Sequence, residues 1–549
     1  MTKHTAGVSP SGERAADMPW AGWSEPLALP DGARALLQAF LGTDLTPSAA
    51  TAEADVALPT SRLPAAAAAA FAGAIGPGHV NSGRPSRLGH TGGKSTPDLL
   101  RRRRGDAAAA PDAVLTPGSH DEVLAVLDAA SMHHVAVVPF GGGTSVTGGV
   151  EALRGQFGAV IALDLRRLNR LVNLDAESLT ATLQAGLRGP QAEALLAAHG
   201  LTLGHLPQSF EHATIGGFAA TRSAGQASAG YGRFDDMVLA IRAATPRGTV
   251  DAGGRAPASA AGPDLRQLLL GSEGTFGVIT EVTVRVRRQP AAVLDEAWSF
   301  PDFGSGMTAL RTLTQTGEGT PDIVRLNDPT DTAIVTLGQN RARTGAPEIT
   351  GCLAITSYEG TAAGTAARRA AAAAVFGQHG GYSLGPEPVA TWRAGRFSAP
   401  RLRDTLLDVG VFVETLETAA SWAALPALHA AVPAALTASL TAAGTPPVVS
   451  CHISHVYPSG ASLYYTVIAG QAADPLAAWA AAKAAAADAI MEQGGTITHH
   501  HAVGTDHRAW MHAEIGDLGV AVLRAVKAAL DPVGVLNPGK LIPPQSEAP

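Results

Sequence analysis

Apolar and polar residues alternate between residues 111 and 290 in a way that predicts strands separated by helices. Short apolar runs predict strands, and they lie at residues 113–115, 135–138, 160–165, 179–183, 237–245 and 278–286. Ser119 and Glu122 form a capping-box pattern, so we expect a helix from there to about His133. Gly189-Pro190 and Gly200 bound a further helix, because proline suits a first helical turn and glycine a helix end.

After Pro290 the pattern changes to long alanine-rich segments with strands between them. Because alanine has the highest helix propensity, we expect helices at residues 361–376, 472–491 and 519–530, and strands at 448–452 and 462–468. A chain of 549 residues exceeds what one hydrophobic core supports. We therefore expect a tail at 1–19, a helical segment at 20–107, a first α+β domain at 108–290, a second at 291–501, and a C-terminal segment at 502–549 that returns to the first domain.

Composition narrows the classes of function. A hydrophobic fraction of 46% is typical of a globular protein, and a net charge of -7 argues against nucleic acid as the main partner. The two cysteines, Cys352 and Cys451, form no CxxC pair, so neither a zinc site of that type nor a disulfide framework is indicated. We see no uncharged apolar run of about 18 residues and no export pattern in residues 1–19. We expect a cytoplasmic protein and leave contact with a membrane surface open.

Three glycine-rich segments are candidates for binding an anionic or flat ligand. The first, residues 139–149, follows a strand, and its consecutive glycines let backbone N–H groups approach an anion such as a pyrophosphate. No helix begins within it, so it differs from the Rossmann fingerprint. The second, residues 207–225, is dense in small side chains that suit a flavin ring, and the third, residues 271–280, lies at a loop-to-strand junction. Each taken singly is also compatible with ordinary turns.

Histidine and tyrosine residues form the candidate catalytic group. His499, His500 and His501 follow a predicted short strand at 496–498, so strand alternation places His499 and His501 on one face and His500 on the other. This triple could bind a metal, handle protons or lie exposed at a strand end. With no acidic or cysteine ligand nearby in sequence, we expect no metal and favour proton handling. Tyr464 and Tyr465 lie in an apolar strand, where alternation turns one inward and one outward.

Two arginines lie in or beside apolar segments, and one further histidine lies beside a glycine segment. Arg325 lies in an apolar strand, and Arg403 precedes a mostly apolar run, so each needs a partner for its charge. Either could form a structural ion pair, although arginine also suits phosphate or carboxylate binding. His205 stands just before the second glycine segment, where it could face a flavin.

In order and spacing, the glycine segments resemble the FAD-binding half of the vanillyl-alcohol oxidase, or PCMH-type, flavoprotein family. The resemblance implies an α+β fold with a two-lobed PCMH-type FAD-binding domain and a second α+β substrate, or cap, domain. It implies FAD contacts from Pro139, Gly141, Gly142, Gly143, Thr144, Ser145, Pro207, Gln208, Ser209, Thr214, Gly216, Gly217, Thr221, Glu273, Gly274, Gly277, Val278 and Ile279. Many members attach FAD through a loop histidine or cysteine, which the first segment lacks, so a noncovalent flavin is expected.

Further motifs resemble the alkyldihydroxyacetonephosphate synthases of that family. They are Trp20-x-Gly22-Trp23, Gly204-His205-x-Pro207-x-Ser209, Thr245 to Gly248, Val324-Arg325-Leu326, Arg403-Asp404, Glu414 to Trp422, Gly460-Ala461-x-x-Tyr464 and His499-His500-His501-x-Val503-Gly504. The resemblance implies exchange of the acyl chain of acyl-dihydroxyacetone phosphate for a fatty alcohol through a flavin N5 adduct, in ether-lipid synthesis. It makes Tyr464 the acid/base, with His205 and His499 to His501 assisting proton transfer. Arg325 and Arg403 would support the tyrosine or hold phosphate. Because members often pair, a homodimer stays open.

A second reading is an FAD-dependent dehydrogenase or oxidase of a 2-hydroxy acid or related alcohol. The segment Asp531 to Lys540 resembles the 2-hydroxy-acid oxidoreductases of the same superfamily, and Ala502 replaces the glycine that follows the triple histidine in the synthases. That class, however, carries Glu-His-Gly-x-Gly where this chain has His499 to Gly504. A non-catalytic flavin-binding or lipid-binding scaffold is the third reading, and the polar groups near the proposed ring argue against it.

Overall fold

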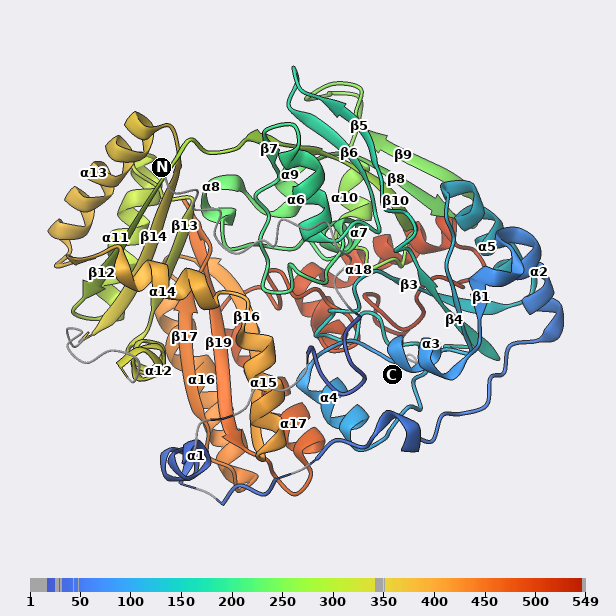
Figure 1. Cartoon of the computed structure of the whole chain (residues 1–549), viewed down its shortest axis with the longest axis horizontal. Helices are drawn as coiled ribbons and strands as arrows, with labels where there is room; N and C mark the ends of the chain where they lie inside the picture. Colours follow the sequence, from blue (N-terminus) through green and yellow to red (C-terminus); the bar gives the residue numbers. More distant parts are fainter. Residues whose placement is uncertain are drawn as a thin grey trace.

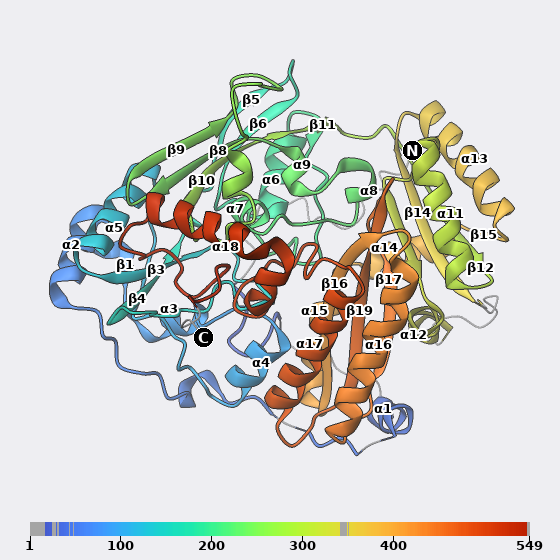
Figure 2. The same cartoon turned by 180° about the vertical axis from the view of Figure 1, so that it is seen from behind.

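The structure is a computed structural model that describes residues 17–545, apart from residues 25–28, 30, 31, 43, 48, 341–348 and 350. Figure 1 shows two domains side by side, the first built from strands β1 to β11 and the second from β12 to β19. Helix α18 (Met511–Leu530) follows the second domain in sequence but lies against the first (Figure 2). The α+β fold with two such domains, predicted by the resemblance, is confirmed.

A four-stranded sheet forms one lobe of the first domain. Its order is β1 (Val80–Asn81), β2 (Ala113–Leu115), β4 (Ala159–Asp164) and β3 (Val135–Phe140), with β2, β4 and β3 parallel. Almost every side chain of these three strands is buried, as in parallel strands covered on both faces. Helices α2 (Ala65–Ile75) and α5 (His120–Met132) belong to the same core. Ser119 caps α5 as predicted, whereas the Glu122 carboxylate accepts the N–H of Gly118 instead of completing the box.

A five-stranded antiparallel sheet forms the other lobe. Its order is β5 (Leu171–Asp175), β6 (Thr180–Gln184), β10 (Val278–Arg285), β8 (Val238–Thr245) and β9 (Gly248–Gly253). The sequence predicts the three central strands but misses β5 and β9, because these edge strands bury almost none of their side chains and show no apolar run. A two-stranded ribbon pairs β7 (Leu201–Thr202) with β11 (Arg287–Arg288). The shorter helices are α1 (Ala33–Leu41), α3 (Arg84–Gly89), α4 (Thr96–Arg103), α6 (Gly189–Ala197), α7 (Ile215–Ala220), α8 (Ser228–Tyr231), α9 (Phe234–Met237) and α10 (Arg266–Leu269).

The second domain is an antiparallel sheet covered by helices. The sheet order is β15 (Tyr382–Gly385), β12 (Ala292–Phe300), β14 (Cys352–Gly360), β13 (Ile323–Asn327), β17 (Val448–Ile453), β19 (Gly460–Gly470) and β16 (Val411–Ser421), and β18 (Val456–Tyr457) pairs with β19. Its core joins one face of the sheet to α11 (Phe303–Thr316), α13 (Ala362–Gln378), α16 (Leu425–Ala442) and α17 (Pro475–Glu492). The remaining helices are α12 (Pro329–Asn340), α14 (Glu387–Gly395) and α15 (Ala399–Asp408).

Helix α16 is long and apolar enough, by length and composition, to cross a membrane, which the sequence expectation did not foresee. Its buried residues return every three or four positions and pack in the core of the second domain: Leu425, Leu428, Val432, Leu436 and Leu440. This is the burial pattern of a helix that packs on a sheet. A single helix of this kind says little about membranes, because core helices pass the same test.

Arginines of helix α4 are buried between the N-terminal segment and the glycine segments. Arg102 donates to the carbonyls of Thr91 and Gly92 and lies over the ring of Trp20. Burial lowers the pKa of Arg102 to about 10. A run of basic residues such as Arg101 to Arg104 usually forms a solvated helix end, but here Arg102 and Arg103 are buried.

Candidate active site

The first glycine segment follows β3 and presents a row of backbone N–H groups. Within the described part of the chain, the amides of residues 141–145 donate to no protein acceptor. Gly143 has a φ of 69°, which favours glycine and allows the chain to turn here. Successive backbone N–H groups in such a turn form a concave binding place for an anion. The segment therefore fits the diphosphate of a dinucleotide.

The glycines of the first segment are also required by the second segment, which lies against it. A Cβ on Gly141 would lie 2.3 Å from the hydroxyl oxygen of Thr214, and one on Gly142 would lie 2.1 Å from the carbonyl oxygen of His212. Thr214 in turn accepts the N–H of Gly217 and so caps helix α7. The two segments thus form one continuous surface, as a ligand that spans both requires.

The third segment connects this surface to the C-terminal part of the chain. Glu273 has a φ of 52°, and its two carboxylate oxygens accept the N–H of Gly504 at 2.9 Å. The backbone carbonyl of Glu273 accepts from the side chain of Asn537 at 2.6 Å. Burial raises the pKa of Glu273 to about 7. A Cβ on Gly274 would lie 2.7 Å from Pro139, so the third segment also packs against the first.

The other residues predicted to contact FAD lie in the same segments and form hydrogen bonds typical of turns and helix ends. Ser209 begins a turn in which its carbonyl accepts from His212 and Ala213, and Gln208 is exposed. Thr221 ends α7 and donates to the carbonyl of Gly217. Their contacts with the flavin, and those of Pro207, Gly216, Gly277, Val278 and Ile279, stay predictions.

Tyr464 lies on β19, on the sheet face opposite the helices. Strand alternation separates it from Tyr465, whose hydroxyl donates to the carbonyl of Leu428 on α16. The Tyr464 ring stacks on His452 with ring centroids 4.9 Å apart, and it lies nearly parallel to the ring of His500 at 6.0 Å. Burial first, and then nearby carboxylates, raise the pKa of Tyr464. The phenol therefore keeps its proton at neutral pH and can act as an acid.

The three consecutive histidines lie in a loop that one buried carboxylate holds in place. Glu417 on β16 accepts the backbone N–H groups of His499, His500 and His501 at 2.7, 3.1 and 2.9 Å. It also accepts the hydroxyl of Thr498 at 2.6 Å. The predicted strand at 496–498 is absent, and the prediction of His499 and His501 on one face is wrong with it. Backbone amides that converge on an anion need a turning chain, which a strand does not provide.

Burial sets the protonation of this cluster. It lowers the pKa of His499 and of His501 to about 3, so both imidazoles are neutral near pH 7 and can accept protons. Burial also opposes ionisation of Glu417, but the histidines beside it, His500 first, hold its pKa well below the ordinary value. Glu417 is paired with Tyr464 across β16 and β19. The carboxylate thus positions the histidine loop relative to the tyrosine.

Arg325 is joined to Tyr464 through neighbours rather than directly. Its guanidinium donates to the side chains of Asn327 and Asp331, each at 2.7 Å. The Nδ1 atom of His452 lies 3.6 Å from the Asp331 carboxylate, and the His452 ring stacks on Tyr464. The structure therefore places Arg325 behind the tyrosine, where its charge helps to keep His452 neutral, because burial first and then Arg325 lower the pKa of His452.

Arg403 and His205 border the cluster on two other sides. Arg403 on α15 donates to the carbonyl of Lys94, lies 3.5 Å from the Glu414 carboxylate and influences the pKa of Tyr464. His205 comes from the first domain, where its Nε2 lies 3.0 Å from the Ser223 hydroxyl. Burial first lowers the pKa of His205 to about 3, and His500 contributes to the shift. Arg403 therefore lies near Tyr464 and His205 near the histidine loop, and phosphate binding by Arg403 stays a prediction.

Sequence reasoning missed several members of the site: His452, His455, Tyr457, Asp331 and the central role of Glu417. Their signal was weak but present, because a charged or imidazole group in an apolar strand needs a partner. Glu417 lies in the mostly apolar strand β16, and His452 ends the apolar strand β17.

Comparison with known proteins agrees with this geometry. Residues 111–252 match the family described as "FAD binding domain", and residues 289–541 match "FAD linked oxidases, C-terminal domain". The alkyldihydroxyacetonephosphate synthase of Trypanosoma brucei brucei is 35% identical over 484 residues, which cover 84% of this chain and 78% of that protein. The chain belongs to the alkyldihydroxyacetonephosphate synthase family. The synthase of Dictyostelium discoideum is 33% identical over 85% of this chain and 79% of that protein.

The fold comparison extends the likeness to almost the whole chain. A solved alkyldihydroxyacetonephosphate synthase structure superposes with a TM-score of 0.80 at 28% identity and covers 96% of this chain and 99% of that chain. This member of the family is an FAD-linked enzyme, and FAD is its cofactor. The row of free amides at residues 141–145 and the glycines packed around it fit this assignment.

Proposed function

We propose that this enzyme exchanges the acyl chain of acyl-dihydroxyacetone phosphate for a fatty alcohol. The fatty alcohol loses its hydroxyl proton and forms the ether bond, while the acyl chain leaves as a fatty acid. Electrons balance within the exchange, so no external electron acceptor is needed. Family membership supports this reaction class.

The observation that carries the proposal is the position of Tyr464. Its phenol lies among imidazoles from two separate segments, β17 and the histidine loop. At neutral pH the phenol carries its proton while the His499 and His501 imidazoles are unprotonated, so the site holds a group with a proton to give and groups with a free nitrogen to receive one. An acyl-for-alkyl exchange requires both kinds of group.

The cofactor and the phosphate would be held by other parts of the site. FAD, when bound, would supply the ring nitrogen N5 to carry the dihydroxyacetone phosphate carbon between loss of one chain and arrival of the other. The free amides at residues 141–145 would bind the FAD diphosphate. Arg403 would contribute positive charge near Tyr464, where the substrate phosphate needs a counter-charge.

The proposal is tested with purified protein and two substrates. Palmitoyl-dihydroxyacetone phosphate is added with and without hexadecanol, in the absence of an electron acceptor, and free palmitate and the hexadecyl ether are measured by mass spectrometry. We expect both products with hexadecanol present and flavin absorbance that recovers after the reaction. The proposal fails if neither product forms while the protein carries FAD.

The second candidate is oxidation of a 2-hydroxy acid, because residues 289–541 match the FAD-linked oxidase family. D-lactate supplied alone separates the two reactions. Lasting loss of flavin absorbance on addition of D-lactate would support the oxidase reaction. An unchanged spectrum would favour the exchange.

A further inference from the structure

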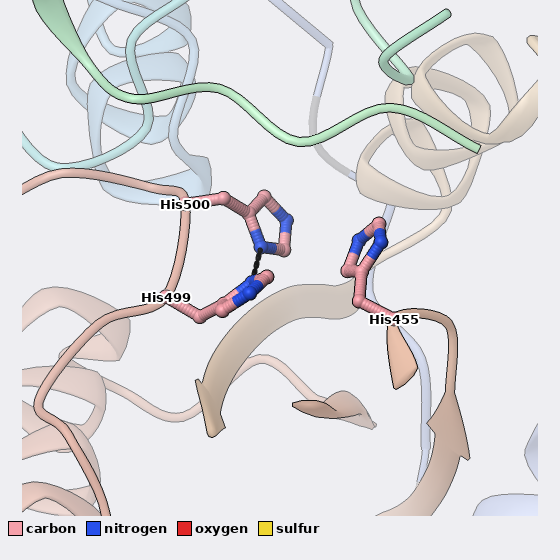
Figure 3. Close-up of side chains that lie close together, drawn as sticks. All are labelled: His455, His499 and His500. Carbon is pink, nitrogen blue, oxygen red and sulfur yellow. Dashed lines mark hydrogen bonds between the residues drawn. The ribbon is translucent and has the colours of Figure 1, made fainter. Parts of the chain in front are cut away.

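Three imidazoles from two different segments meet on one side of the site. His455 lies between β17 and β18, and His499 and His500 come from the loop held by Glu417 (Figure 3). One nitrogen of each ring lies within 4.8 Å of the corresponding nitrogen of the other two. The Nδ1 atoms of His499 and His500 are 3.1 Å apart, and Figure 3 shows His455 across a short gap from this pair.

The spacing of the rings matches that of three imidazoles around one metal ion. Their ring centroids are separated by 5.1 Å for His455 and His499, 5.4 Å for His455 and His500, and 5.4 Å for His499 and His500. In a tetrahedral site with zinc–nitrogen bonds of about 2.0–2.1 Å, imidazole centres lie about 5.2 Å apart and ligand nitrogens roughly 3.4 Å apart. The ring centroids are thus at ligand spacing, whereas the nitrogens, which lie within 4.8 Å of one another, must come closer together to share one ion.

The Nδ1 atoms of His499 and His500 hydrogen-bond each other, and a metal ion would replace the proton that they share. The Nδ1 of His455 is buried and has no hydrogen-bond partner among the described residues, and His455 is only 5% exposed. The Nε2 of His499 bonds the hydroxyl of Tyr457 at 2.6 Å. A ligating histidine commonly donates its second ring N–H to an oxygen in this way, which fixes the other nitrogen as an electron-pair donor.

Charge also suits a cation here. The Glu417 carboxylate lies 3.4 Å from the Nδ1 of His500, at the edge of the cluster. Imidazoles with one adjacent carboxylate suit zinc and related transition metals.

We propose that His455, His499 and His500 bind one divalent transition-metal ion of the zinc class. Three protein ligands leave a fourth position for water or an oxygen of a substrate. The expectation of no metal site rested on the lack of ligands nearby in sequence, whereas the fold brings His455 to the other two histidines. The metal site shares His499 with the acyl-exchange proposal, but metal binding is measured without turnover, so the two proposals can fail separately.

The test is zinc binding to the untagged, FAD-loaded protein after treatment with a chelator. Isothermal titration with zinc chloride at pH 7.5 should show one equivalent bound. Zinc-edge X-ray absorption should show imidazole ligands at about 2.0–2.1 Å. No bound zinc, or a spectrum with oxygen ligands only, would overturn the proposal even if no variant can be prepared.

A matched pair of variants locates the site. His455→Asn removes one ligand with a side chain of similar size, and we expect at least about a 10-fold loss of zinc affinity, as ligand-shell changes typically cause. His512→Asn is the control, because His512 lies on α18, is 41% exposed and pairs with Asp517. Equal zinc affinities in both variants, with normal FAD content, would place the metal elsewhere and refute the proposal.

Discussion

Single residues of this site act in pairs that the two main strands hold in register. Glu417 on β16 lies opposite Tyr464 on β19, and Thr415 pairs with Thr466 on the same strands. Because a sheet fixes the spacing of cross-strand neighbours, the carboxylate that binds the histidine loop and the phenol that faces it cannot move independently. The strand pair therefore sets the spacing between the Glu417 carboxylate and the Tyr464 phenol.

Tyr464→Phe removes the phenolic proton and leaves the ring stacked on His452. We expect kcat for acyl exchange to fall by about 10²–10⁴-fold, the usual contribution of a general acid or base. The flavin absorption bands of the purified variant should stay unchanged. Tyr382→Phe, at a 50% exposed position, is the control. Loss of FAD from the Tyr464 variant would contradict its placement in the catalytic group.

Glu417→Gln tests the carboxylate that holds the histidine loop. The amide can accept some of the backbone N–H groups but lacks the charge, so we expect a loss of roughly 2–5 kcal/mol of stability. Activity should fall as well, because the loop loses its position. Thermal melting and kcat are the measurements. Glu514→Gln is the comparison, since Glu514 accepts only from Thr496 and Ile497 at the start of the loop and is less buried. Wild-type stability and kcat in the Glu417 variant would refute this role.

At the scale of elements, the glycine segments offer backbone N–H groups to a ligand and pack against each other where a Cβ is missing. The first segment fits against the second only because positions 141 and 142 carry no side chain. The small residues here thus have two roles. They allow the two segments to pack closely, and they leave the backbone N–H groups accessible.

Gly142→Ala should disrupt this fit. The added Cβ would meet the carbonyl oxygen of His212 at 2.1 Å, so one segment must shift, and we expect at least about a 10-fold weaker FAD affinity. Gly158→Ala is a matched control, because a Cβ there has no neighbour within 4 Å. Flavin fluorescence during titration of the apoprotein with FAD gives both affinities. Equal affinities would show that the contact between segments is not needed for FAD binding.

Element prediction from sequence succeeded where local pattern decides structure and failed where distant residues decide it. The strands β3, β4 and β8 follow from apolar runs, and helix α13 follows from its alanines. The loop at 496–501 could not be predicted, because a carboxylate on β16 sets its conformation. The role of Glu417 as the centre of the site was likewise hidden, since its partners are backbone amides that carry no sequence signal.

At the scale of the whole molecule, the site is assembled from both domains and the C-terminal segment. His205 comes from the first domain, Tyr464 from the second, and Gly504 joins the histidine loop to Glu273. Buried neutral histidines in this assembly make its stability depend on pH.

Stability should fall as the pH is lowered from 6.5 toward 3. The folded-state pKa values of His205, His499 and His501 are about 3, whereas unfolded histidine has a pKa of about 6.5. The unfolded chain therefore binds more protons in this range, and the contribution of these groups is complete only above about pH 6.5. Melting temperatures read from flavin fluorescence between pH 8 and pH 4 test this. His501→Gln should flatten the slope, and a profile without any decline would contradict the buried neutral state.

The way Glu417 holds the histidine loop affects which substitutions the loop can accept. The carboxylate holds the loop mainly through main-chain N–H groups and the Thr498 hydroxyl, and its contacts with the imidazoles of His500 and His501 are longer, at 3.4 and 4.0 Å. Every amino acid except proline offers the same N–H. The side chains at positions 499 to 501 can therefore be substituted while Glu417 keeps the loop backbone in the same conformation. The chemistry of the site can change in this way without a change of fold.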